Sequence, residues 1–226
     1  MSDMKDHKRV NDILLGPLER PALQWLSARM PVWITPDVCT AIGVLGTVII
    51  SLGYILSNMD RNFLWLASFG FVVNWFGDSL DGTLARYRHI ERPKFGFFID
   101  HTIDTFCQIM IFFGMGLSPY VSFNIASLAL VGYLALGVLA YVRIIVAGEF
   151  KLSYGKLGPT EIRVIAILLN TSMYFIGIKT LDWGIAGYSF TLSVYDFVIL
   201  FIALLLFGFF LNTAWKQARL LVKLGE

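Results

Sequence analysis

Long apolar runs alternate with short polar or Gly/Pro-rich breaks along this chain. A transmembrane helix needs about 20 mostly apolar residues, and the runs have roughly that length. The pattern therefore predicts six transmembrane helices, at about residues 37–57, 62–86, 95–117, 121–147, 161–179 and 192–214. Because no repeat or low-complexity tract separates the runs, we expect residues 35–226 to form one all-α membrane domain.

The composition supports a membrane protein. Of the 226 residues, 57% are hydrophobic and 15% are charged, and a soluble domain of this size could not hide so much apolar surface from water. Cys39 and Cys107 lie in apolar surroundings without the spacing of metal ligands, so we interpret them as small buried residues. The N-terminal residues are too polar for a secretory signal.

Basic residues are distributed asymmetrically about the predicted helices. Six spans place both termini on one side, which carries 16 of the 18 Lys and Arg residues; only Arg61 and Lys179 lie on the other side. By the positive-inside rule, the basic side is cytoplasmic. We therefore expect a multi-pass integral membrane protein, in the cell inner membrane if the source is bacterial. The net charge is only +2, and we expect no nucleic-acid partner.

Residues 1–34 form a separate N-terminal segment. From residue 10 onward, leucines alternate with charged and polar residues, and Pro17 and Pro21 interrupt the pattern. Such a stretch is too polar to span a membrane, so it predicts one or two short amphipathic helices along the cytoplasmic surface. Thr35 and Pro36 are expected to be the N-cap and first residue of the first span.

Two pairs of aspartates lie within or beside the second and third predicted spans. Asp78 and Asp81 are three positions apart, and Asp100 and Asp104 are four apart, so each pair occupies one helix face. Ionisable groups at such depth cost a few kcal/mol each and are rare without a function. Helix-end charges paired with nearby arginines would explain one or two of these aspartates, but not two spaced pairs.

Small residues share the faces that carry the aspartates. Gly82 and Ala85 fall within about a 100° arc of the Asp78/Asp81 pair, and Gly96 lies one turn before Asp100. Residues with little or no side chain let a bulky ligand or a neighbouring backbone approach closely.

Four carboxylates in one place repel one another unless cations neutralise them. Carboxylate-rich oxygen sites suit hard divalent ions, which commonly bind substrate phosphates as well. We therefore predict that the four aspartates hold Mg²⁺ or Mn²⁺, as two ions, and bind an anionic substrate.

The aspartate segment resembles the signature of the CDP-alcohol phosphatidyltransferase family, also called CDP-alcohol phosphotransferases. Every fixed position of that signature is present, in the order Asp78-x2-Asp81-Gly82-x2-Ala85-Arg86-x9-Gly96-x3-Asp100-x3-Asp104. The start of the first span is also similar to the family pattern, although Asp37 stands where asparagine is usual; it reads Thr35-Pro36-Asp37-x2-Thr40-x2-Gly43.

The resemblance implies an activity and a set of roles. In this family an acceptor hydroxyl attacks the distal phosphorus of a CDP-alcohol, such as CDP-diacylglycerol, and CMP leaves from a site at the cytoplasmic face. By similarity, Asp78, Asp81 and Asp100 are metal ligands, and Asp104 is both near the metals and the general base. The CDP-binding residues implied are Asp37, Thr40, Asp78, Gly82, Ala85, Arg86 and Gly96. The resemblance also implies a homodimer among membrane lipids.

A second, looser group of basic and polar residues suggests a pocket for acceptor or lipid phosphate. It comprises Arg143, Lys156, Thr160 and Arg163, near the predicted start of the fifth span, and helix N-termini attract phosphate. Ordinary membrane anchoring explains some of these charges equally well. His101 follows Asp100 directly, and adjacent residues on a helix point apart, so we interpret it as a hydrogen-bonding or cavity-lining group rather than a ligand.

Other functions compete with this prediction. A UbiA-type prenyltransferase also binds Mg²⁺-diphosphate with Asp-x3-Asp, but typically has two separated aspartate motifs and more helices. A cation transporter could use intramembrane carboxylates, although those should lie near the membrane midplane. An intramembrane aspartyl protease needs Gly-x-Gly-Asp, which is absent around Asp78. The acceptor alcohol stays open; Asp100-His101-x2-Asp104-Thr105 looks slightly more like choline and ethanolamine phosphotransferases than like glycerophosphate-using members.

Overall fold

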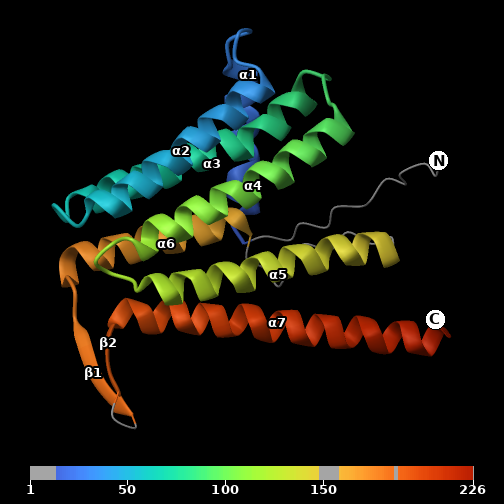
Figure 1. The fold of residues 1–226 in the computed structure, drawn as a ribbon. Helices are drawn as coiled ribbons and strands as arrows, with labels where there is room; N and C mark the ends of the chain where they lie inside the picture. Colours follow the sequence, from blue (N-terminus) through green and yellow to red (C-terminus); the bar gives the residue numbers. More distant parts are fainter. Residues whose placement is uncertain (1–13, 148–157, 186–187, 226) are drawn as a thin grey trace.

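The computed structural model describes residues 14–147, 158–185 and 188–225. Within these ranges the helices are α1 (Gly16–Arg29), α2 (Pro36–Leu56), α3 (Phe63–Tyr87), α4 (Pro93–Gly116), α5 (Phe123–Ala147), α6 (Pro159–Ile176) and α7 (Val194–Leu224), and the strands are β1 (Thr180–Ile185) and β2 (Tyr188–Ser193). Helices α2 to α7 follow the six predicted runs, although α7 continues beyond the predicted end at residue 214. The predicted helical fold class is confirmed (Figure 1).

The lengths and compositions of these helices match a membrane protein. Helices α2, α3, α5 and α7 are each long and apolar enough to cross a bilayer. The other two predicted spans, α4 and α6, contain charged residues: α4 carries Asp100 and Asp104, and the 18-residue α6 has Glu161 and Arg163 in its first turns. The chain is therefore an integral membrane protein, whereas a count of six crossings and the sidedness of the termini stay predictions.

One hairpin was not predicted. The segment after α6, interpreted from its glycines and polar residues as a loop, contains β1 and β2 paired antiparallel from Thr180↔Ser193 to Ile185↔Tyr188. Ser193 ends the hairpin and caps α7, since its Oγ accepts a hydrogen bond from Asp196 N at 2.9 Å. The buried Asp196 carboxylate also accepts from Ser122 N at 2.6 Å, which fixes the start of α7 against the start of α5.

Helices α2 and α3 pack backbone against backbone through glycines. A Cβ added at Gly46 would overlap the backbone of Asn74, and one added at Gly77 would overlap the backbone of Gly43. Close approach of this kind is typical of helix pairs in membranes, where van der Waals packing drives association. The contact holds the first aspartate pair against α2 at a fixed distance.

We expect Gly46→Ala to destabilise the protein. The added methyl group has no room between α2 and α3, and overpacking of this kind costs about 1–3 kcal/mol. Gly137→Ala is the matched control, because a Cβ at Gly137 meets no atom within 4 Å. Thermal unfolding in detergent should show a lower midpoint for Gly46→Ala only. Equal midpoints for the two variants would contradict a tight α2–α3 contact.

Buried polar contacts hold the other helices to this pair. Tyr54 on α2 donates its hydroxyl to Asn170 Oδ1 on α6 at 2.9 Å, and Asn170 Nδ2 donates to Ser68 Oγ on α3 at 3.2 Å. Ser51 Oγ on α2 donates to Met110 O on α4 at 2.6 Å. Polar groups away from water must be hydrogen-bonded, so these contacts specify how α4 and α6 dock. Helix α2 thus packs against both α3 and α4.

In its described part, residues 14–34, the N-terminal segment forms the helix α1, and residues 10–13 of the predicted amphipathic stretch lie outside the described residues. Helix α1 packs against α3, with Leu23 and Ser27 buried in the contact. Thr35 caps α2 as predicted, accepting a hydrogen bond from Val38 N at 3.3 Å, and Pro36 is the first residue of α2. Four backbone carbonyls between α1 and α2 accept hydrogen bonds from Arg88 at the end of α3; they belong to Met30, Pro31, Val32 and Ile34.

Candidate functional site

The four predicted aspartates line one pocket. Its walls come from α2, α3 and α4, and it encloses about 270 Å³ of space between atoms, open solvent at its mouth included. The lining residues are Thr40, Gly43, Val44, Asn74, Asp78, Asp81, Asp100, Ile103, Asp104 and Cys107. The spacing within each helix predicted which residues share a face, and the packing of α2 on both α3 and α4 brings the two faces together.

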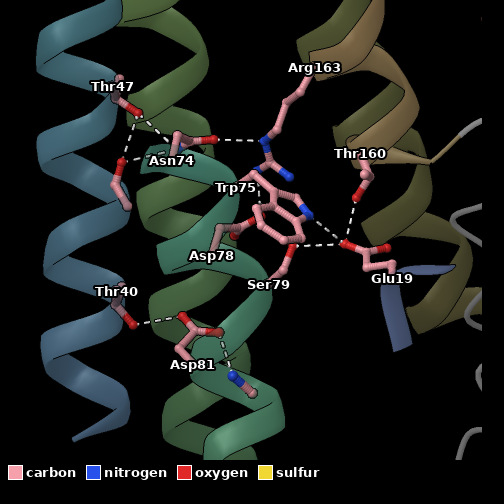
Figure 2. Close-up of polar contacts among 12 residues, drawn as sticks. Glu19, Thr40, Thr47, Asn74, Trp75, Asp78, Ser79, Asp81, Thr160 and Arg163 are labelled. Carbon is pink, nitrogen blue, oxygen red and sulfur yellow. Dashed lines mark hydrogen bonds and ion pairs between the residues drawn. The ribbon is translucent and has the colours of Figure 1, made fainter. Parts of the chain in front are cut away.

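Asp81 is held toward α2. Thr40 Oγ1 donates to Asp81 Oδ2 at 2.8 Å, and the backbone N of Gly82 lies 2.5 Å from Asp81 Oδ1 (Figure 2). Thr40, which the resemblance places among the CDP-binding residues, therefore contacts an aspartate of the site directly. Two hydrogen bonds fix the orientation of this carboxylate.

Asp78 forms an ion pair with α6. Arg163 Nη2 lies 2.5 Å from Asp78 Oδ2, and Arg163 Nε donates to Asn74 Oδ1 at 2.8 Å (Figure 2). Asn74 is itself held by α2, because its Nδ2 donates to Gly43 O at 3.0 Å and to Thr47 Oγ1 at 3.1 Å. The side chains of Arg163 and Asp78 are 14% and 34% exposed, so the attraction is screened less than at an open surface.

The second aspartate pair lies on α4, on the opposite wall. Asp100 and Asp104 are exposed in the isolated chain, and Asp104 accepts no hydrogen bond from the residues described. His101 is turned elsewhere: its Nδ1 lies 2.8 Å from Phe97 O, and its ring stacks on Phe97 and meets the edge of Tyr141 on α5. This position agrees with the prediction that His101 does not point where Asp100 points.

The two glycines of the motif have different surroundings. The guanidinium of Arg86 lies 3.4 Å from where a Cβ on Gly82 would be, and a Cβ on Gly96 would meet no atom within 4 Å. Arg86 is exposed and donates to Thr83 Oγ1 at 3.2 Å, while Ala85 is partly buried. Gly82 and Gly96 thus differ from Gly46 and Gly77, where the backbone of the neighbouring helix occupies the space beside the glycine.

Asp37 and the residues of the predicted phosphate pocket each contact a different side chain. Asp37 forms an exposed ion pair with Arg92, at the start of α4. Arg143 Nε donates to Gln217 Oε1 on α7 at 3.3 Å, and Thr160 Oγ1 donates to Glu19 Oε1 on α1 at 2.7 Å. Arg163 contacts Asp78, and Lys156 lies outside the described residues. The phosphate pocket stays a prediction.

The donor set of the pocket fits a hard divalent ion in its chemistry. Carboxylate oxygens are the ligands that such ions prefer, and four carboxylates line the pocket. In the conformation described, however, no three His, Cys, Asp or Glu side chains within residues 14–147, 158–185 and 188–225 are placed to hold one ion. Asp78 and Asp81 are turned toward Arg163 and Thr40 instead, so metal binding requires these side chains to rotate.

Sequence reasoning missed several residues of the site. Asn74 lies one turn before Asp78 on the same face of α3, so the helical spacing could have identified it. Cys107 was interpreted as a small buried residue; it is buried, and it also lines the pocket. Arg163 contacts Asn74 and Asp78 on α3, and Glu19 accepts hydrogen bonds from Trp75 and Ser79 on the same helix. No sequence signal indicated these contacts, because they join residues distant in sequence.

Comparisons with known proteins agree with the motif. A family model described as CDP-alcohol phosphatidyltransferase matches residues 33–207. The archaetidylinositol phosphate synthase of Pyrococcus horikoshii is 38% identical over 99 residues, which are 44% of this chain and 50% of that protein. The phosphatidylinositol phosphate synthase of Cutibacterium acnes is 37% identical over 86 residues, which are 37% of this chain and 38% of that protein.

A more distant relative matches a longer stretch. Cholinephosphotransferase 1 of Gallus gallus is 25% identical over 180 residues, which are 76% of this chain and 53% of that protein. This chain thus spans about half the length, or less, of the curated relatives it matches.

Proposed function

This chain belongs to the CDP-alcohol phosphatidyltransferase family, and we propose that it transfers a substituted phosphate group from a CDP-alcohol to the hydroxyl of an acceptor alcohol, with release of CMP. The observation that carries the proposal is the pocket between α2, α3 and α4, which all four aspartates of the motif line. The match over residues 33–207 favours this function over a UbiA-type prenyltransferase or a cation transporter.

Asp78, Asp81, Asp100 and Asp104 are proposed to hold Mg²⁺ or Mn²⁺, as two ions. Bound there, such ions neutralise phosphate charge, stabilise the departing CMP and make the acceptor hydroxyl more acidic. If Asp78 were to bind an ion, it would release the guanidinium of Arg163, a side chain that is only 14% exposed. That guanidinium is then available to a phosphate oxygen of the substrate.

The residues around the pocket support donor binding. Gly96 leaves open space one turn from Asp100, and the exposed Arg86 guanidinium covers Gly82. We propose that the cytidine and its phosphates occupy this space, with Ala85 and Thr40 at its border. We propose that Asp37 lies at the outer edge of the donor-binding space. Its ion pair with Arg92 joins the start of α2 to the start of α4.

The chemical step is a single displacement. The acceptor oxygen forms a bond to the distal phosphorus of the CDP-alcohol, the bond from that phosphorus to the oxygen of CMP breaks, and the acceptor proton passes to Asp104. No covalent intermediate on the protein is needed, and neither Cys39 nor Cys107 acts as a nucleophile. Asp104 suits the role because it lines the pocket and accepts no hydrogen bond from the described part of the chain.

The membrane arrangement is part of the proposal. Six crossings place the pocket mouth, both termini and 16 of the 18 basic residues on the cytoplasmic side. Helix α1 then lies at the cytoplasmic surface. The apolar faces left by the helices pair in a two-fold homodimer within the membrane lipids.

Two substrate pairs are favoured by separate observations. The phosphatidylinositol phosphate synthase of C. acnes favours CDP-diacylglycerol with an inositol phosphate acceptor, and the archaetidylinositol phosphate synthase of P. horikoshii favours the same acceptor. His101 between the second pair of aspartates, together with the G. gallus cholinephosphotransferase, favours CDP-choline or CDP-ethanolamine with diacylglycerol. The first pair has the relatives of higher identity and is our first choice.

We expect purified protein in lipid to release CMP from one of these pairs. The reaction should stop in EDTA and resume when Mg²⁺ or Mn²⁺ is added. CMP should be measured by chromatography across both donors and a panel of acceptors including serine and glycerol phosphate. A reaction without donor or without acceptor is the control for hydrolysis. Full turnover in chelator would overturn the metal proposal, and absence of CMP from every pair would overturn the proposed function.

A further inference from the structure

Glu19 connects α1 to both helices of the Asp78–Arg163 ion pair. Its Oε1 accepts hydrogen bonds from Trp75 Nε1 at 2.8 Å and Ser79 Oγ at 3.1 Å, both on α3, and from Thr160 Oγ1 at 2.7 Å on α6 (Figure 2). One carboxylate oxygen thus gathers three donors from two helices. Hydrogen bonds to an ionised acceptor are stronger than those between neutral groups.

These donors lie next to residues of the site. Ser79 follows Asp78 directly on α3, and Thr160 lies three positions, or about one turn, before Arg163 on α6. Glu19 therefore bridges α3 and α6 within a turn of the point where Arg163 reaches Asp78 (Figure 2). The bridge and the ion pair constrain the same two helices.

A second contact keeps α1 in this position. Glu161 is 4% exposed, and its Oε1 accepts from Leu15 N at 2.6 Å while its Oε2 accepts from Gly158 N at 2.9 Å. The start of α1 is thereby bound to the start of α6. Glu19, one turn further along α1, is directed toward α3 and α6 by this anchor.

We propose that Glu19 is a positioning residue that holds Arg163 on Asp78 and so sets the affinity of the aspartate pocket for a divalent ion. The proposal rests on the proposed function. Arg163 and a metal ion compete for the same oxygen of Asp78. Without the Glu19 bridge, α6 is less firmly docked and Arg163 binds Asp78 more weakly, so a metal ion binds Asp78 more tightly. Turnover falls, because Arg163 no longer meets the substrate in a fixed position.

The test is Mn²⁺ binding to the full chain in lipid nanodiscs, followed by electron paramagnetic resonance. Glu19→Ala should tighten Mn²⁺ binding roughly three- to tenfold, in the lower part of the range expected for coupled neighbours, and lower kcat. Glu19→Gln retains an oxygen acceptor, so its Mn²⁺ affinity should lie between those of Glu19→Ala and the unmodified chain. General damage to the fold would not tighten binding.

Two further variants separate positioning from stability. Ile199→Ala removes a buried contact of α7, which lies outside α1, α3 and α6, so it should lower the unfolding temperature and leave Mn²⁺ affinity unchanged. In an Arg163→Ala background, Glu19→Ala should cause no further change in Mn²⁺ affinity. Unchanged affinity in Glu19→Ala, or the same gain with and without Arg163, would overturn the inference. Mn²⁺ binding that Asp78→Asn leaves intact would instead overturn the proposed metal site.

Discussion

Asp78→Asn is expected to abolish metal-dependent binding of CDP and to lower turnover by roughly 10³-fold or more, because metal stabilisation of a phosphoryl transition state is worth several kcal/mol. Asparagine keeps the size of the side chain but removes its charge, and with it the attraction for a divalent ion and for Arg163. CDP binding should be measured by calorimetry with Mn²⁺ present and then in EDTA.

Asp60→Asn is the matched control. Asp60 lies in the exposed turn between α2 and α3, outside the pocket, and its carboxylate accepts from Asn62, so the substitution should leave CDP binding and turnover unchanged. Asp81→Asn and Asp100→Asn should behave as Asp78→Asn does. Kinetics equal to those of the unmodified chain in any one of the three variants would remove that residue from the ligand set.

The fold could be predicted from the sequence wherever a bilayer-length apolar run was present. Such runs located α2 to α6 to within a few residues, because twenty apolar residues have few alternatives to a helix in lipid. The end of α7 was placed too early, since its last turns are polar and continue beyond the apolar run. The β1–β2 hairpin was missed because its two strands are short and carry no strong turn signal.

The candidate site could be predicted only as far as helical spacing reaches. Spacings of three and four positions correctly paired the aspartates on α3 and α4, and both pairs line the pocket. The family resemblance pointed to Thr40 on α2, but its hydrogen bond to Asp81 and the ion pair between Arg163 and Asp78 could not be predicted, because those contacts depend on how the helices dock. Asp78 and Arg163 are 85 positions apart, and Glu19 reaches Thr160 across 141 positions.

The contacts of the aspartates suggest different roles for them. Asp78 and Asp81 are each oriented by side chains from other helices, as expected for groups that must be placed accurately for a metal. Asp104 lies one turn further along α4 than Asp100, in a part of the pocket lined by Ile103 and Cys107. A carboxylate in that position can meet an acceptor that approaches alongside the bilayer, which suits the proposed role of Asp104 as the general base.

Asp104→Asn is therefore expected to lower turnover by roughly 10²–10⁴-fold, the usual contribution of general-base catalysis, while the affinity for the CDP donor changes little. The amide cannot take the acceptor proton but still fills the same space. The measurement is kcat from CMP release beside donor affinity from calorimetry, with Mn²⁺ affinity determined on the same preparation. If donor and metal binding are lost together, Asp104 is chiefly a ligand, and His101 becomes the next residue to test as the base, through a His101→Gln variant and its pH profile.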